Sequence, residues 1–247
     1  MKQLLYILSV VLLVSCNSEN APDCFQNAGD IIQKEFSVGD FTEIIAFKNI
    51  ELIVTDSATQ NVTVETGEFL MDDIEVTVEN GKLLLKDNNG YNFTRDYGIT
   101  KVFVSSPNVT KIRNSSQFAV RSNGVLNYDD LFLISEDDSG DFYNVGIFDV
   151  EVNTVNLRVT INNITSTFIS GNATNLRISH ASGDGRFEGR NLIVDNVSIY
   201  HRGTNDIIVS PQVSIEAELV STGDVIVTNA PPTVEVSELF NGRVIFE

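Results

Sequence analysis

The sequence predicts an all-β protein: a parallel, β-helix-like solenoid with turns of about 20 residues, preceded by a small antiparallel β region. Short segments led by Gly183, Gly203, Gly223 and Gly242 recur 20, 20 and 19 residues apart. A large apolar residue follows each glycine four positions later, namely Phe187, Ile207, Val227 and Phe246. Asn, Ser, Thr and Val are abundant, and no segment after the N-terminus has a sustained helical period. Stacked strands with an inward apolar column account for all three observations.

The recurring glycines have a backbone explanation. Turns between stacked strands need a positive φ or a tight bend, and glycine adopts these without a penalty from a Cβ atom. An aspartate follows Gly183 and Gly223 directly, where its carboxylate can accept hydrogen bonds from amides of the turn. We therefore expect the glycines to form the corners of the predicted solenoid.

The segment 36–104 has the alternation of apolar and polar residues that is typical of ordinary antiparallel strands. Ile50, Leu52 and Val54 fall on one side of such a strand. Asn80-Gly81 separates two further apolar runs, and both residues tolerate the positive φ that a two-residue hairpin turn requires. The sequence therefore predicts a hairpin at this point.

The N-terminus has the features of an export signal. Lys2 precedes an almost wholly apolar stretch, Leu4 to Val14, that is too short to span a bilayer. Leu13-Val14-Ser15-Cys16 resembles the bacterial lipobox, whose cysteine is lipidated and becomes the mature N-terminus. We predict an exported lipoprotein anchored through Cys16 to the bacterial outer membrane, at the cell surface or the periplasmic face. The alternative is an ordinary secretory signal with Cys16 retained and able to pair with Cys24.

The predicted organisation of the chain follows from these segments. Residues 1–15 are the lipoprotein signal peptide, 16–35 the lipidated cysteine and a linker, 36–104 the N-terminal β region and 105–247 the β-solenoid. The sequence ends on an apolar strand, Val244-Ile245-Phe246, which would leave an open edge. We expect a partner subunit or another element to cover it, so a homo-oligomer formed through this edge is a predicted assembly.

The net charge is strongly negative. The chain has 34 acidic and 16 basic residues, for a formal charge of −18. Such a chain repels phosphate backbones, so we expect no nucleic-acid partner. Solubility is the simplest interpretation of this charge, and a cation-binding surface is the alternative.

Two groups of residues are candidates for ligand binding. The first is a loop with Tyr91, Phe93, Arg95 and Tyr97, since flat rings stack on sugars or peptides. The second is a basic set near the two histidines: Arg177, Arg186, Arg190 and Arg202. The set suits an anionic glycan. For the aromatic loop, the alternative is that its rings pack on the end of the solenoid. For the arginines, the alternative is scattered charge that only makes the protein soluble.

An acidic segment, Glu136 to Asp141, is the candidate for metal binding. Asp137, Asp138 and Asp141 supply the hard oxygen ligands that calcium prefers, although their spacing does not match an EF-hand loop. A solvated acidic turn is the alternative. His180 and His201 are interpreted as surface residues at turns, with side chains that face opposite ways. We expect no catalytic residues and, apart from calcium, no cofactor.

The order of these features resembles the head GIN domain family, also called putative autotransporter adhesin domains, over residues 36–247. The matching stretches are Phe41-Thr42-Glu43-Ile44, Ile50-Glu51-Leu52-Ile53-Val54, Val62-Thr63-Val64, Asn80-Gly81-Lys82-Leu83, Val102-Phe103-Val104-Ser105-Ser106-Pro107 and the Ser/Thr-Gly-Asp turns. The resemblance implies one β-solenoid domain on an envelope lipoprotein or secreted protein, and it implies no established catalysis.

These observations together predict a non-catalytic envelope lipoprotein. Its solenoid would bind or scaffold, as an adhesin does, toward a glycan, another polymer or a protein ligand. One alternative is a β-helix polysaccharide lyase or hydrolase acting near Asp137, Asp138 and Asp141. A second alternative is a structural envelope protein that self-associates.

Overall fold

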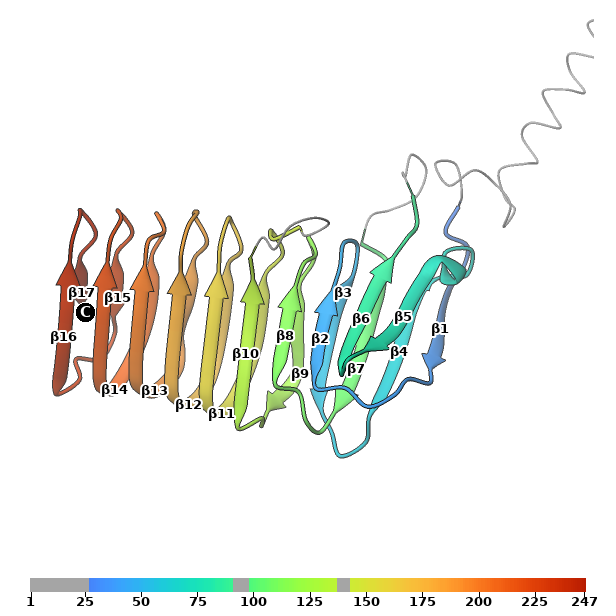
Figure 1. Ribbon diagram of the computed structural model, residues 1–247, viewed down its shortest axis with the longest axis horizontal. Coiled ribbons are helices and arrows are strands. Elements are labelled where there is room, and N and C mark those ends of the chain that lie inside the picture. Colours follow the sequence, from blue (N-terminus) through green and yellow to red (C-terminus); the bar gives the residue numbers. More distant parts are fainter. Residues whose placement is uncertain (1–26, 91–97, 137–142) are drawn as a thin grey trace, which may run out of the picture.

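The computed structural model describes residues 27–90, 98–136 and 143–247 (Figure 1). These residues contain seventeen strands in one sheet and no α-helix, so the predicted all-β class is confirmed. The strands are β1 (Ile31–Phe36), β2 (Glu43–Ala46), β3 (Glu51–Asp56), β4 (Asn61–Gly67), β5 (Ile74–Glu79), β6 (Lys82–Asp87), β7 (Lys101–Ser106), β8 (Lys111–Asn114), β9 (Val120–Leu126), β10 (Asp130–Ser135), β11 (Phe148–Ile161), β12 (Thr167–His180), β13 (Phe187–His201), β14 (Ile207–Leu219), β15 (Val225–Val227), β16 (Thr233–Glu238) and β17 (Val244–Phe246). A 3₁₀ turn, η3 (Met71–Asp73), precedes β5.

Every pairing that the structure describes among β8 to β17 is parallel, and we call these strands the parallel stack. Thr167 of β12 lies opposite Phe187 of β13, and Phe187 lies opposite Ile207 of β14. The interval between these partners along the chain is the interval at which the glycines recur. In β11 and β12 alternate residues are buried, and they belong to one continuous apolar core.

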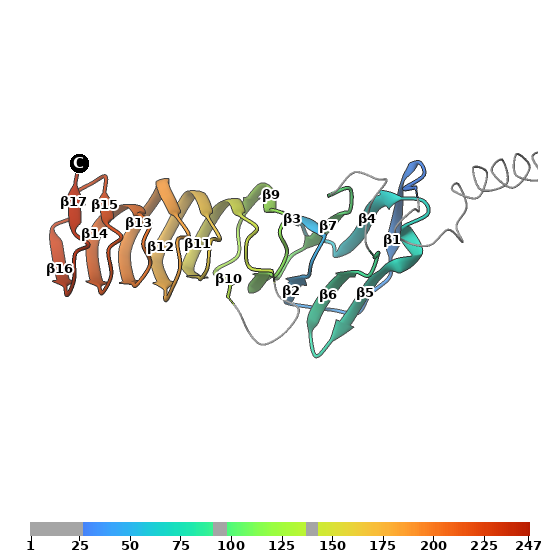
Figure 2. The same ribbon diagram turned by 90° about the horizontal axis from the view of Figure 1, so that it is seen from above.

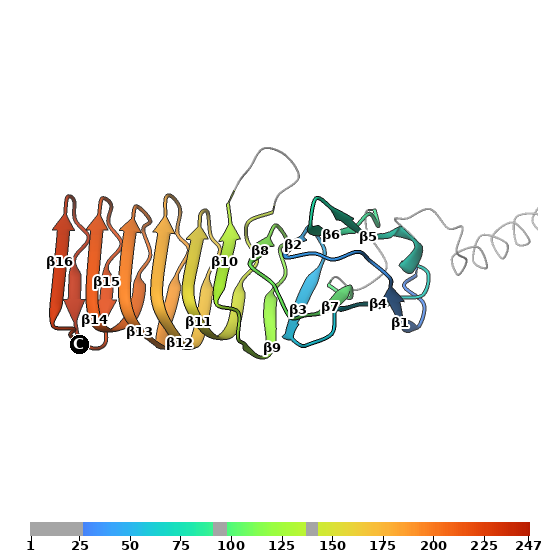
Figure 3. The same ribbon diagram turned by 60° about the horizontal axis from the view of Figure 1, so that its bottom comes forward.

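The parallel stack has two faces (Figures 2 and 3). β14 pairs with β15 through Ile207–Val209 and with β16 through Ser214–Leu219, so its two halves belong to different faces. The front face contains β8, β10, the C-terminal halves of β11 to β14, and β16. The back face contains β9, the N-terminal halves of β11 to β14, β15 and β17.

The N-terminal region, β1 to β7, is antiparallel only in part, whereas a wholly antiparallel region was predicted; β1 pairs with β4 in antiparallel fashion. β5 and β6 are antiparallel, as are β4 and β7, but β2 pairs with β6 and β3 pairs with β7 in parallel. β2 also pairs with β8, and β3 with β9, so the two strands extend the front and back faces. The prediction was wrong for β2 and β3, because alternating apolar residues define which side of a strand is buried but not the direction of its neighbour.

The predicted hairpin at Asn80-Gly81 is confirmed. β5 and β6 are antiparallel, with Glu79 opposite Lys82 across the two-residue turn. Asn80 has a φ of 51° and Gly81 a φ of 75°, as a turn of this kind requires.

Packing explains two of the recurring glycines better than backbone conformation does. Of the four, Gly183 alone has a positive φ, at 98°. A Cβ atom at Gly203 would lie 2.1 Å from Cε1 of His180, and one at Gly223 would lie 2.3 Å from Nε2 of His201. These two glycines are therefore required because buried imidazole rings occupy the space that a side chain would take.

The inward column also differs from the prediction at its C-terminal end. Phe187 and Ile207 are aligned and buried as expected, but Val225, not Val227, continues their row. Val244 follows Val225 in the same row. The last two turns reach the row at the second position after their glycine and not at the fourth, because their corners are shorter.

The parallel stack ends at β16 and β17. Among the described strands, β16 pairs only with β14 and β17 only with β15. Val234 and Val236 are aligned with the buried Ile215 and Ala217, yet they are 44% and 40% exposed. No other described element covers this edge, so its covering by a partner subunit or by another element stays a prediction.

Candidate binding groove on the front face

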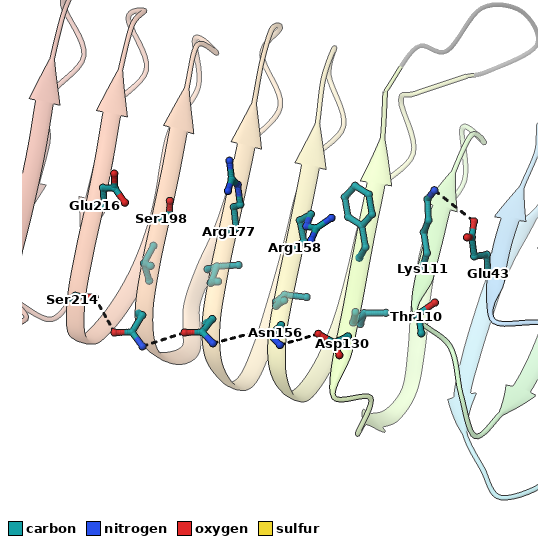
Figure 4. Close-up of a pocket in the computed structure, with 17 residues that line it drawn as sticks. Glu43, Thr110, Lys111, Asp130, Asn156, Arg158, Arg177, Ser198, Ser214 and Glu216 are labelled. Atoms are coloured by element: carbon teal, nitrogen blue, oxygen red, sulfur yellow. Dashed lines mark hydrogen bonds and ion pairs between the residues drawn. The ribbon is translucent and has the colours of Figure 1, made fainter.

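A groove with a volume of about 630 Å³ crosses the front face (Figure 4). It extends from Glu43 of β2 and Lys111 of β8 to Ser214 and Glu216 of β14. Consecutive strands here are parallel and in register, so outward side chains line up in rows that run across the strands. Two of these rows line the groove.

The first row is a hydrogen-bonded ladder of amides, which we call the asparagine ladder (Figure 4). Nδ2 of Asn156 donates to Oδ1 of Asp130 at 2.8 Å, and Nδ2 of Asn175 donates to Oδ1 of Asn156 at 2.9 Å. Asn196 continues the ladder with a bond of 3.2 Å to Asn175, and Oγ of Ser214 donates to Asn196 at 2.9 Å. These bonds use one hydrogen of each amide, so every asparagine retains a second donor.

The second row carries charge. In the order of the strands it consists of Lys111, Phe132, Arg158, Arg177, Ser198 and Glu216. The guanidinium of Arg158 lies 5.1 Å from the centroid of the Phe132 ring, and Nζ of Lys111 lies 5.7 Å from it. Lys111 also forms an ion pair of 3.5 Å with Glu43. Cation–π contacts from both neighbouring strands therefore hold the Phe132 ring.

Arg158 and Arg177 are the electrostatically unusual members of this row. They lie opposite each other on adjacent parallel strands, both exposed. Neither forms an ion pair with any residue in the part of the chain that the structure describes. Two like charges side by side disfavour each other, so this pair lowers stability in the absence of a ligand.

The four arginines predicted as one basic set do not lie together. Arg177 is on the front face, in the groove. Arg186 pairs with Glu188 at 3.0 Å and with Asp206 at 3.4 Å, and Arg190 pairs with Glu188 and Glu247 near the back face. Arg202 is exposed in the turn after β13. The structure therefore places Arg177 opposite Arg158, which was not among the predicted site residues.

The interpretation of His180 and His201 as surface residues facing opposite ways was wrong. Their rings are buried and stacked, with centroids 5.2 Å apart and planes inclined by 22°. Burial lowers the pKa of His180 to about 4, and the neighbouring His201 acts in the same direction. Burial also lowers the pKa of His201. The two residues are register partners in parallel strands, so their side chains point the same way into the core.

Other predicted site residues fall outside the described part of the chain. They are Cys16, Tyr91, Phe93, Arg95, Tyr97, Asp137, Asp138 and Asp141. Within the described ranges no group of three or more His, Cys, Asp or Glu side chains is arranged to hold a metal ion. Lipidation at Cys16, ligand binding by the aromatic loop and calcium binding thus stay predictions.

The sequence does contain a signal for the residues that were missed. Asn156-Leu157-Arg158 recurs one turn later as Asn175-Leu176-Arg177, and Asn196-Val197-Ser198 follows after one further turn. The glycines and the inward apolar pairs mark the corners and the core. The polar residues on either side of each inward residue mark the groove.

Comparison with known proteins places the chain in a family. The chain belongs to the family described as putative auto-transporter adhesin, head GIN domain, whose sequence model matches residues 40–231. The predicted resemblance is confirmed. No curated protein shows a significant match. In the described residues, no helix has the length and apolar character needed to cross a membrane.

Solved structures of bacterial proteins share this fold. A putative adhesin from Bacteroides fragilis NCTC 9343 has 19% identity and a TM-score of 0.79, covering 90% of this chain and 99% of that one. A putative lipid binding protein from Parabacteroides distasonis ATCC 8503 has 13% identity and a TM-score of 0.60, with coverages of 88% and 97%. A putative adhesin from Parabacteroides merdae ATCC 43184 has 18% identity and a TM-score of 0.57, with coverages of 89% and 97%.

Proposed function

We propose that the protein is a non-catalytic, lipid-anchored binding protein of the cell envelope, which presents the front-face groove to an extended ligand such as a glycan. The asparagine ladder is the observation that carries this proposal. It places equivalent amide donors and acceptors on three successive strands, at Asn156, Asn175 and Asn196, in one row that begins at the carboxylate of Asp130. A row of repeated polar groups suits a ligand that itself repeats.

The scaffold behind the groove is, in this proposal, a β-solenoid. Parallel pairing of partners that lie one sequence repeat apart and a continuous inward apolar core support it. Neighbouring strands lie about 4.8 Å apart, so the ladder repeats at that spacing. Such a scaffold is rigid along its length, and a ligand does not have to order it on binding.

A glycan is favoured because amides and an aromatic ring occur in one groove. Amide groups donate to and accept from sugar hydroxyls, and the apolar face of a sugar packs on a flat ring. The second hydrogen of each ladder amide supplies the first kind of contact, and the part of the half-buried Phe132 ring that Lys111 and Arg158 leave accessible supplies the second. A protein ligand remains the second candidate, since its backbone amides also repeat.

The membrane anchor follows from the lipobox-like sequence that ends at Cys16. The family's description as an adhesin supports an exported, envelope-associated protein, and we further propose the outer membrane as its location. Labelling cells with a palmitate analogue should label the wild type and not a Cys16→Ser variant. Protease treatment of intact cells that removes a tag on the chain would place the protein at the surface, and protection until lysis would place it in the periplasm.

Two alternatives stay open. Catalysis on a polysaccharide would rest on Asp137, Asp138 and Asp141, which lie outside the described residues. Self-association would use the exposed edge formed by β16 and β17. Sedimentation that shows only monomers over a wide concentration range would remove this second alternative.

The central test measures binding of the full-length protein, in detergent micelles, to an immobilised panel of neutral and acidic oligosaccharides. Asn175→Ala breaks the ladder in its middle and should weaken binding by about three- to tenfold, the effect of losing one or two hydrogen bonds. Asn172→Ala is the matched control, because Asn172 is exposed on the same strand in its other half. Equal binding by wild type and both variants would overturn the assignment of the groove.

A further inference from the structure

We propose that Arg158 and Arg177 form a binding site for the anionic groups of an acidic polysaccharide, either carboxylates or sulfate esters carried at intervals along its chain. This inference rests on the proposed function, because it assigns a ligand class to the same groove. It is carried by two arginines that are register partners on adjacent strands and have no carboxylate partner among the described residues.

The geometry of the pair suits an anion. Arg158 and Arg177 are direct register partners in parallel strands, so their Cα atoms are about one strand spacing apart. Each guanidinium presents several N–H donors in a planar fork that matches the oxygens of a carboxylate or sulfate. An anion bound between the two forks would replace their mutual repulsion by two attractions.

The other arginines of the described chain show that this arrangement is not a general property of the surface. Ion pairs with acidic side chains are made by Arg113, Arg121, Arg186, Arg190 and Arg243. Arg202 also has no described ion pair, but it is alone in a turn. A protein with 34 acidic residues thus leaves two adjacent arginines unneutralised, and it does so inside a groove.

The surroundings of the pair point to a sugar that carries the anion. Asn156 and Asn175 lie two positions before Arg158 and Arg177 on the same side of their strands, and Phe132 contacts Arg158. An acidic sugar residue could place its charged group between the guanidiniums, its hydroxyls on the amides and its apolar face on the ring. Phosphate or sulfate alone would use only the first of these contacts.

The rest of the front face argues against a uniformly charged partner. Glu216, Glu218 and Glu235 line the adjoining part of the face, next to Arg177. An anionic membrane surface or a nucleic acid would bring its charges against these carboxylates, which repel them. A polysaccharide with separated acidic groups can place one at the arginines and neutral units beside the glutamates.

The experiment measures the affinity of the full-length protein, in detergent micelles, for defined probes. These are an oligogalacturonate (carboxylates), a heparin-derived oligosaccharide (sulfates) and neutral cellohexaose, with anionic and neutral lipid vesicles and a single-stranded oligonucleotide as competitors. The variants are Arg158→Ala/Arg177→Ala, the conservative Arg158→Lys/Arg177→Lys, and Arg202→Ala as a control for loss of charge elsewhere. Thermal melting checks that each variant is folded.

We expect at least one acidic oligosaccharide to bind more tightly than cellohexaose. The double alanine variant should lose at least about tenfold in affinity for it, since each charge-assisted hydrogen bond contributes more than a neutral one. The lysine variant should retain part of the affinity, Arg202→Ala should retain nearly all, and added salt should weaken binding. The preferred oligosaccharide distinguishes carboxylate from sulfate.

Several outcomes would overturn the inference. An equal loss for Arg202→Ala and the double alanine variant would show non-specific charge attraction. Tighter binding to anionic vesicles or the oligonucleotide than to either acidic oligosaccharide would show that the ligand is a membrane surface or a nucleic acid and not an acidic polysaccharide. Binding of cellohexaose that depends on Asn175 but not on the arginines would remove the anion site and leave the proposed function intact. Failure of all the oligosaccharides to bind would remove both.

Discussion

The parallel stack and the N-terminal region bury similar apolar strands but choose their partners differently. In the stack, Thr167, Phe187 and Ile207 are successive partners, each one sequence repeat after the last. In the N-terminal region, Glu43 pairs both with Lys82 and with the much later Lys111. A constant separation produces a pattern that can be seen in the sequence, whereas variable separations do not.

The two regions also differ in the contacts that stabilise them. In the proposed solenoid each turn of the stack contacts its neighbours, so we expect the stability of the stack to be approximately a sum of nearest-neighbour terms. β2 and β3 depend on segments that come much later in the chain, β8 and β9. Closing such long loops costs conformational entropy before the contacts form. Substitutions in the two regions should therefore have effects of different size.

The largest effect is expected from a glycine that the stack packs closely. Gly183 has a φ of 98°, and a Cβ atom there would lie 2.0 Å from the carbonyl oxygen of Asn163. Gly81 in the N-terminal hairpin has a φ of 75° but nothing within 4 Å. Gly183→Ala should reduce the free energy of unfolding by about 3 kcal/mol or more, from backbone strain plus overlap. Gly81→Ala should cost about 1 kcal/mol, from strain alone.

Denaturant unfolding of the two variants measures this difference. Because both changes add one methyl group at a positive φ, they differ mainly in the backbone that surrounds the site. Equal losses of stability would mean that neighbouring turns of the stack yield as easily as an exposed hairpin, and would contradict the close packing described above.

A pH effect of intermediate size is expected from the buried histidines of the stack. His180 has a pKa of about 4 in the folded protein, against about 6.5 when unfolded, so below pH 6.5 the unfolded chain takes up the proton first. The contribution of neutral His180 to the free energy of unfolding is complete above pH 6.5 and is lost as the pH falls toward 4. We expect this to lower the free energy of unfolding by about 2 to 3 kcal/mol between pH 7 and pH 4.

The double variant His180→Leu/His201→Leu is the comparison for this effect. Leu219 already occupies the next position of the same inward row, so leucine suits that environment. Subtracting the pH dependence of the variant from that of the wild type removes the contribution of the many carboxylates. Hydrogen exchange should show the change in β12 and β13 and not in β2 and β3; a uniform change over both regions would argue against the histidines as its source.

The smallest effect is expected where the two regions join. Arg121 of β9 pairs with Glu51 of β3 at 3.1 Å and also with Asp149 of β11. Its side chain is 42% exposed, so Arg121→Ala should cost only about 0.5 to 1 kcal/mol. Arg243→Ala, which breaks a pair at the far end of the stack, is the control. Two separate unfolding transitions in Arg121→Ala alone would reveal that this ion pair couples the regions more than its exposure implies.

The parts of the fold that could be predicted are those fixed by local chemistry. Asn80-Gly81 determines its hairpin because two adjacent residues must both tolerate positive φ, and the regular spacing of the glycines matches the pairing of β12, β13 and β14. The parallel pairing of β3 with β7 could not be predicted, because a strand carries no local mark of its partner's direction. The shift of the inward row to Val225 likewise depends on the length of a corner.

The candidate site was predictable only in part. Arg177 was selected, but for a cluster with Arg186 and Arg190, which pair with Glu188 instead. Proximity in the sequence favoured that cluster, whereas the register of parallel strands places Arg177 beside Arg158 of the preceding turn. The burial of His180 and His201 was missed for a similar reason, since polar residues in an inward row look like turn residues when the row is not aligned correctly.

The asparagine ladder has a direction. Each amide donates toward Asp130, and the hydroxyl of Ser214 donates into the opposite end. The strands beneath it also all run the same way, so the front face does not superimpose on itself when it is turned end for end. A polysaccharide has a reducing and a non-reducing end. A polysaccharide that lies along this groove would therefore bind in one orientation and not in the reverse. Its reducing end would always point the same way relative to the N-terminal region.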